Sequence, residues 1–146
     1  MSKVRYSFAF FDSMNEYSGN GERLSGRVGQ FVDWKESGKE PARPFKDKSS
    51  AKNDRGEVFR PYQRAQVRHC HCGFFPNGDP LIAYRIRPDG SILIIAITHH
   101  HEMFNPQARE NFLQKYKSAF DEGIIPSMRN IIALIESIDD IDEHQN

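Results

Sequence analysis

Five of the six histidines in this chain of 146 residues lie in two short clusters. The first cluster, residues 69–72, reads His-Cys-His-Cys, and the second, residues 99–101, is three consecutive histidines. Histidine gives and takes protons near neutral pH, and it is also a common ligand of protein-bound metal ions. The two clusters therefore indicate either acid–base chemistry or a metal site.

The spacing of the first cluster argues against a metal site made from this cluster alone. On a β-strand, successive side chains point to opposite faces, so His69 and His71 share one face while Cys70 and Cys72 share the other. The four side chains could not then surround one ion, and the C-x2-4-C spacing of structural zinc sites is absent from the sequence. We expect the cysteines to be small buried hydrophobes, and we expect no cofactor.

Basic side chains near the histidines indicate a phosphodiester substrate. Arginine binds phosphate oxygens and stabilises developing negative charge, while histidine transfers protons. Together they can cleave RNA by activating its 2′-hydroxyl, with no metal ion. We predict three catalytic residues, His69, His71 and His101, the last because it is the histidine nearest to the start of a predicted helix. We predict that five residues bind phosphate, with Lys52 as a further candidate: Arg68, Arg85, Arg87, Lys46 and Lys48.

Plainer interpretations of these residues stay open. Arg85 and Arg87 alternate on a predicted strand and could form a solvated face of the sheet. Three consecutive histidines could equally be a solvated linker.

Composition and charge favour one soluble globular domain with an anionic partner. Hydrophobic residues make up 38% of the chain and charged residues 27%, and no apolar run approaches the ~20 residues of a membrane span. The N-terminal stretch is too polar for a signal peptide, so we expect a cytoplasmic protein with no membrane partner. Residues 33–68 carry ten Lys or Arg against six Asp or Glu, and residues 102–146 carry four against nine. The basic front half suits an anionic partner.

Hydrophobic periodicity predicts an α+β fold with a small, mainly antiparallel sheet, an N-terminal helix and C-terminal helices. The clearest feature is a pair of strands joined by Pro-Asp-Gly, with Asn105 and Pro106 at the start of the helix that follows. Ile95 and Phe112 are predicted core residues. The predicted elements, in chain order, are a strand (6–11), a helix (22–38), a long polar loop (38–61), strands (62–75, 81–87 and 91–98) and helices (104–123 and 126–138).

The order of several short motifs resembles the YafO family of bacterial toxins. The matching stretches are Trp34-Lys35, Gly38, Pro41, the Pro-Phe-Lys-Asp of 44–47, His69 with His71, the apolar strand 92–97, and His101-Glu102. The chain departs from the family pattern at Lys46, where glycine is expected, at Cys72, where an apolar residue is usual, and in the extension 124–146.

The resemblance implies a RelE/ParE-like toxin domain over residues 1–123, followed by a helical extension with an acidic tail over 124–146. It also implies an mRNA interferase of a type II toxin–antitoxin system. Such an enzyme cuts mRNA on the translating ribosome and is neutralised by a cognate antitoxin protein. Two alternatives remain: a non-catalytic module that binds and inhibits a protein, and a metal-dependent hydrolase that uses the histidines.

Overall fold

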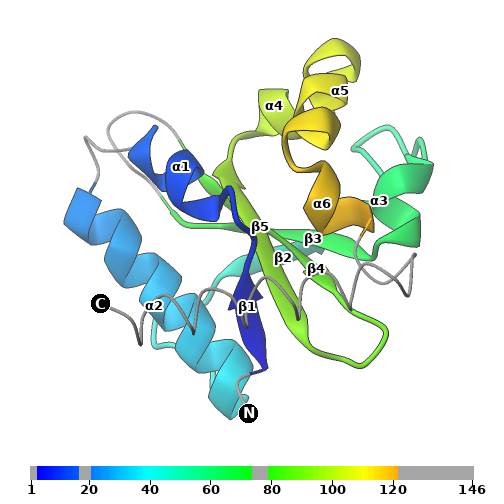
Figure 1. Cartoon of the computed structure of the whole chain (residues 1–146). Helices are drawn as coiled ribbons and strands as arrows, with labels where there is room; N and C mark the ends of the chain where they lie inside the picture. Colours follow the sequence, from blue (N-terminus) through cyan, green and yellow to red (C-terminus); the bar gives the residue numbers. More distant parts are fainter. Residues whose placement is uncertain (1–2, 17–20, 74–78, 122–146) are drawn as a thin grey trace, which may run out of the picture.

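The computed structural model describes residues 3–16, 21–73 and 79–121 (Figure 1). The predicted helix 126–138 and the extension 124–146 lie outside the described residues. The elements are β1 (Val4–Tyr6), α1 (Phe10–Asn15), α2 (Gly21–Ser37), β2 (Lys46–Ser49), α3 (Arg60–Arg64), β3 (Val67–His71), β4 (Leu81–Ile86), β5 (Ile92–Thr98), α4 (His100–Phe104), α5 (Pro106–Lys115) and α6 (Lys117–Asp121). No helix within these residues is long and apolar enough to cross a membrane.

A five-stranded sheet forms the centre of the fold, in the order β1-β5-β4-β3-β2. β1 runs parallel to β5, and the other three pairs of neighbours are antiparallel. The predicted hairpin is present: β4 and β5 are joined by the Pro-Asp-Gly turn, in which Gly90 adopts a φ of 86°. The prediction of an α+β fold with a mainly antiparallel sheet is confirmed.

Helices cover both faces of the sheet (Figure 1). On one face, Leu24, Val28 and Phe31 of α2 pack against Cys70, Cys72, Tyr84 and other residues of the strands. On the opposite face, the apolar side chains of α3 to α6 pack on β3, β4 and β5, as in the contacts of Tyr62, Met103 and Phe112. Both predicted core residues are buried, Ile95 at 0% and Phe112 at 1% exposure.

Several element boundaries differ from those predicted. The strand predicted over 6–11 ends at Tyr6, because the chain turns at Ser7, whose carbonyl accepts from the Phe10 N–H, and then enters α1. The long helix predicted after Asn105 is divided at Tyr116 into α5 and α6. Its start is confirmed, since the Asn105 side chain accepts from the N–H groups of Gln107 and Ala108, both at 3.1 Å.

The polar segment predicted as a loop contains an edge strand. β2 pairs with β3 over four residues, although its sequence, Lys-Asp-Lys-Ser, has no apolar side chain. An edge strand needs only one hydrogen-bonded neighbour, and charged side chains are frequent on such edges. This pairing places lysines beside the first histidine cluster.

Candidate active site

The first histidine cluster lies on β3 with its side chains sorted as the alternation predicts. His69 shares a face with Val67, which belongs to the core beneath α3 to α6. Cys70 and Cys72 point to the other face, into the core beneath α2, and both are fully buried. The cysteines are therefore buried apolar packing residues, as expected. They lie on the opposite face of the sheet from the histidines.

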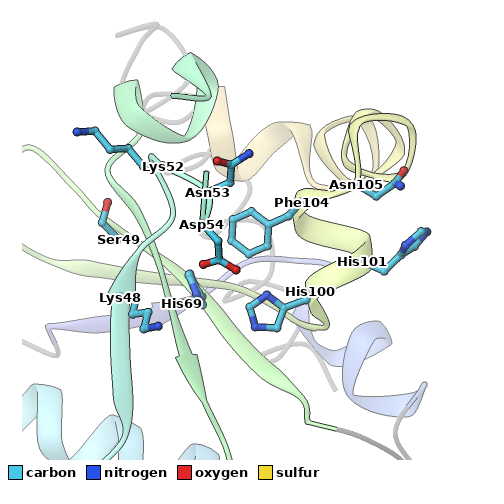
Figure 2. Close-up of a pocket in the computed structure, with 10 residues that line it drawn as sticks. All are labelled: Lys48, Ser49, Lys52, Asn53, Asp54, His69, His100, His101, Phe104 and Asn105. Carbon is cyan, nitrogen blue, oxygen red and sulfur yellow. The ribbon is translucent and has the colours of Figure 1, made fainter. Parts of the chain in front are cut away.

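A third histidine, His100, joins this pair from α4. Figure 2 shows its ring turned toward His69, while His101 points away. The ring centroids lie 5.7 Å apart for His69 and His100, 5.0 Å for His71 and His100, and 5.8 Å for His69 and His71. One ring nitrogen from each of the three histidines lies within 4.8 Å of the other two. We call these three residues the histidine cluster.

The start of α4 determines which histidine of the run faces the cluster. His99 caps the helix, because its side chain accepts a hydrogen bond from the Glu102 N–H at 3.3 Å. Glu102 is also held by the Thr98 hydroxyl, which donates to its carboxylate at 2.5 Å. His99 and His101 are the immediate neighbours of His100, and adjacent residues on a helix do not share a face, so neither ring joins the cluster. Because the capping residue His99 is extended rather than helical, its ring lies against that of His101, with centroids 6.4 Å apart.

Two members of the cluster have a partner at their Nδ1 atoms. His69 Nδ1 lies 2.8 Å from the hydroxyl oxygen of Ser50, and His71 Nδ1 lies 2.7 Å from a carboxylate oxygen of Asp79. A carboxylate at one ring nitrogen orients the imidazole and leaves the other nitrogen for chemistry. In both histidines that other nitrogen is Nε2.

The surroundings favour neutral imidazoles at two positions. Burial, together with the neighbouring His100 and His71, lowers the pKa of His69 to about 4. Partial burial and the neighbouring His71 also lower the pKa of His100. Both rings are therefore proton acceptors, rather than cations, near neutral pH.

Two of the predicted lysines lie beside the cluster. In the register of β2 and β3, Lys46 is opposite His71 and Lys48 is opposite His69. Residues directly opposite each other in an antiparallel pair point to the same face, so both exposed lysines share the histidine face. The edge strand β2 therefore places two positive charges on the histidine face.

The histidines and lysines line two neighbouring hollows. The larger, of about 510 Å³, is formed by residues that include Lys48, Lys52, Asp54, His69, His100 and Phe104 (Figure 2). His101 also lines this hollow, although its ring is turned away from His69. The Phe104 ring is partly exposed there, with its centroid 5.1 Å from that of His69 and 5.5 Å from that of His100. The smaller, of about 300 Å³, is formed by Lys46, Lys48, His71, Asp79, Gly73, Pro44 and the arginines Arg27 and Arg43.

Two features shape the smaller hollow. Arg27 is 7% exposed and donates to the carbonyls of Cys72 and Arg43, both at 2.9 Å, so it ties α2 to the neighbouring loops. Gly73 has a φ of 106°, and a β-carbon there would lie 2.6 Å from the Arg43 guanidinium. A larger residue at 73 would therefore both strain the backbone and displace Arg43.

Comparisons with known proteins do not identify a function for this chain. No protein-family model and no curated protein matches the sequence. Among solved structures, the chain is similar to a metal-bound toxin from Helicobacter pylori. The TM-score is 0.43 and the sequence identity 22%, over 71% of this chain and 100% of the toxin chain. At this level of similarity, nothing about function follows from the toxin.

The predicted arginines and His101 do not join the cluster. Arg85 is on the histidine face but is 4% exposed beneath α6, where it donates to the carbonyls of Ala119 at 3.0 Å and Phe120 at 3.3 Å. Arg68 points to the other face and donates to Asp47 at 3.2 Å. Arg87 follows β4 at the end of the sheet away from His71.

Sequence reasoning missed His100, Ser50, Asp79 and Phe104. One feature of the sequence could have revealed two of them. Residues four apart on a helix share a face, so His100 and Phe104 should point in the same direction. Their helix is one short turn between a strand and Pro106, which hid this spacing. Ser50 and Asp79 lie outside helices and strands, where periodicity carries no information.

Proposed function

We propose that the protein is an endoribonuclease that cleaves RNA by general acid–base catalysis without a metal ion. The observation that supports this best is the convergence of His69, His71 and His100 beside Lys46 and Lys48 on an accessible face. Proton-transfer groups and phosphate-binding cations are the two components that the reaction needs.

The chemistry follows from these groups. A neutral imidazole takes the proton of the 2′-hydroxyl, and the resulting alkoxide attacks the adjacent phosphorus. The bond to the 5′-oxygen breaks, and a second histidine donates a proton to this leaving oxygen. His100 is neutral and exposed and is assigned as the base. His71, held by Asp79, is assigned as the acid. His69, 4% exposed, positions the other two rings.

The two lysines are assigned to phosphate binding. Lys46 and Lys48 lie on the neighbouring strand, opposite His71 and His69, with exposed side chains. An ammonium there stabilises the charge that develops on the phosphoryl oxygens. The partly exposed Phe104 ring offers a surface on which an unpaired base can stack. This combination suits single-stranded RNA.

The biological role comes from the resemblance to YafO-family toxins. On that basis, the substrate is mRNA on the translating ribosome, the fold of residues 1–123 is of the RelE/ParE type, and a cognate antitoxin neutralises the protein in the bacterial cytoplasm. Arg68 and Arg87 stay as predictions for more distant RNA contacts. The buried Arg85 has no part in this proposal, and His101, which lines the larger hollow but lies outside the histidine cluster, is assigned no proton transfer.

Induced expression in a bacterial host tests the proposal. Primer extension on one abundant message, with and without its start codon, would compare the wild type with His71→Ala. We expect cuts only in the translated message and only with the wild type. Cuts that persist in His71→Ala would contradict the assigned chemistry, and cuts in the untranslated message would contradict ribosome dependence.

A second candidate function is a non-catalytic module that binds a protein. It is favoured by an exposed aromatic group at the N-terminus, in which Tyr6, Phe8 and Phe11 are 41%, 68% and 62% exposed. Large apolar side chains that gather on a surface often mark protein contacts. If Phe8→Ser/Phe11→Ser abolishes growth arrest while His71→Ala retains it, this second function replaces the first.

A further inference from the structure

The histidine cluster has the donor set of a transition-metal site. Its three members come from two elements, β3 and α4, and each brings a ring nitrogen to within 4.8 Å of the other two. Four consecutive side chains of one strand could not surround one ion, because they alternate between the two faces of the sheet. Two ligands on one strand face and a third from a neighbouring helix can do so.

The distances between the three ring nitrogens are short enough for one ion to bind after the rings move slightly closer together. Zinc binds imidazole nitrogen at about 2.0–2.1 Å, so two nitrogens at tetrahedral positions lie about 3.4 Å apart. The cluster is at most about 1.4 Å wider than that, since its nitrogens lie within 4.8 Å. His100 is exposed at the start of a five-residue helix, so rotation of its side chain can supply this closure.

Partners around the rings match those of metal-binding histidines. Such histidines usually donate their second ring N–H to a carboxylate or another oxygen, which orients the ring. Asp79 occupies that place for His71, and Ser50 occupies it for His69. Figure 2 also shows the Asp54 carboxylate turned toward the same hollow, where it can offset part of the charge of a cation.

We infer that His69, His71 and His100 bind one divalent transition-metal ion of the zinc class through ring nitrogens. Three imidazole ligands suit zinc, copper, nickel or cobalt, whereas magnesium and calcium need oxygen ligands. Three protein ligands leave a fourth position open toward the larger hollow.

The ion would bind ring nitrogens of the two histidines that transfer protons in the proposed reaction. A bound ion prevents His100 from accepting a proton and His71 from donating one. We therefore infer that zinc inhibits the enzyme. This part of the inference depends on the proposed function, whereas the binding site itself does not.

Metal binding is tested on the full chain, purified without a histidine tag and stripped with EDTA. Cobalt(II) is the probe, because tetrahedral nitrogen ligation gives it strong visible absorption. We expect one equivalent to bind, and zinc to displace it. His100→Ala should weaken cobalt binding at least about tenfold, and Asp79→Asn by about 10–100-fold, as for other oriented ligands. The matched control is His101→Ala, which changes an exposed histidine one residue away and should bind as the wild type does.

Equal cobalt binding by the wild type and His100→Ala would overturn the site, as would an equal loss in His101→Ala. Circular dichroism of each variant separates loss of a ligand from loss of the fold.

Cleavage assays in EDTA and in one equivalent of zinc test the inhibition. Cleavage in EDTA that zinc suppresses supports both inferences. Cleavage that requires zinc would support the metal site but would contradict both the inhibition by zinc and the metal-independent mechanism. No cleavage in either buffer, with cobalt binding intact, overturns the proposed function alone.

Discussion

The Nδ1 atom of His69 lies 2.8 Å from the hydroxyl oxygen of Ser50, and both residues are almost completely buried, at 4% and 1% exposure. Ser50 directly follows the edge strand β2, and its N–H also donates to the Val67 carbonyl at 2.9 Å. The pair therefore joins the strand that carries the lysines to the strand that carries the histidines.

Removing one member of this pair should destabilise the fold. Ser50→Ala leaves the buried His69 Nδ1 without its partner, which should cost about 1–3 kcal/mol of unfolding free energy. The double change Ser50→Ala/His69→Phe makes both partners apolar and should cost less than the sum of the two single changes. Urea denaturation at pH 7.5 in EDTA measures all four proteins. Additive costs would show that the two side chains do not interact.

The low pKa of His69 predicts loss of stability in acid. An unfolded histidine titrates near 6.5 and the folded one at about 4, so between these values the unfolded chain binds the extra proton. The contribution is fully present above pH 6.5 and is lost as the pH falls toward 4. A shift of this size corresponds to roughly 3 kcal/mol, and the lowered pKa of His100 acts in the same direction.

Chemical denaturation in EDTA, repeated at several values between pH 7.5 and pH 4, measures this loss. The variant Ser50→Ala/His69→Phe lacks the group and serves as the comparison. Its stability should fall less steeply over the same interval. Parallel curves for the wild type and the variant would mean that His69 titrates at its ordinary pKa.

Lys46 and Lys48 should contribute to RNA affinity through their charge. Each lysine that contacts a phosphate of single-stranded RNA adds about 0.7 to the slope of log K against log salt concentration. Lys46→Ala/Lys48→Ala should therefore reduce the slope by about 1.4 and weaken binding most at low salt.

The matched control is Lys39→Ala/Lys117→Ala, which removes two exposed lysines that form neither hollow. Fluorescence anisotropy with a labelled single strand, using the His71→Ala background to prevent cleavage, gives the slopes. Equal reductions in the two double variants would assign the effect to net charge rather than to the histidine face.

Cys70 and Cys72 should be unreactive in the folded protein. Both are 0% exposed, and burial raises the pKa of Cys72 to about 12 and also raises that of Cys70. Because the thiolate is the reactive form, a thiol-specific chromogenic reagent at pH 8 should label neither residue until urea unfolds the chain. Two thiols should then react. Rapid labelling of the native protein would show that one of these cysteines is accessible and could belong to a reactive site.

The features that sequence predicted best have a local physical cause. The Pro-Asp-Gly turn between two apolar runs specifies a hairpin, and Asn105 before Pro106 specifies a helix start. Alternation on a strand was enough to separate His69 from Cys70. In each case, neighbouring residues alone determine the outcome.

What sequence could not predict depends on contacts between distant elements. His100 rather than His101 faces the cluster because His99 caps α4 and sets the phase of the helix. Arg85 lies on the histidine face, but α6 covers it. β2 has no apolar pattern and exists because β3 offers an unpaired edge. Asp79 is eight residues along the chain from His71, and its carboxylate lies 2.7 Å from the His71 ring.

The proposed catalytic centre includes His100 and excludes its neighbour His101. Cleavage of a 5′-labelled single-stranded RNA should be measured in EDTA with purified wild type, His100→Ala and His101→Ala. The two histidines are adjacent and both are exposed, so the variants differ mainly in the direction that the lost ring faced. We predict a loss of about 10²–10⁴-fold for His100→Ala, as for other general acid–base residues, and little change for His101→Ala. Wild-type cleavage by His100→Ala, or an equal loss in His101→Ala, would contradict the assignment of the histidine cluster as the catalytic centre.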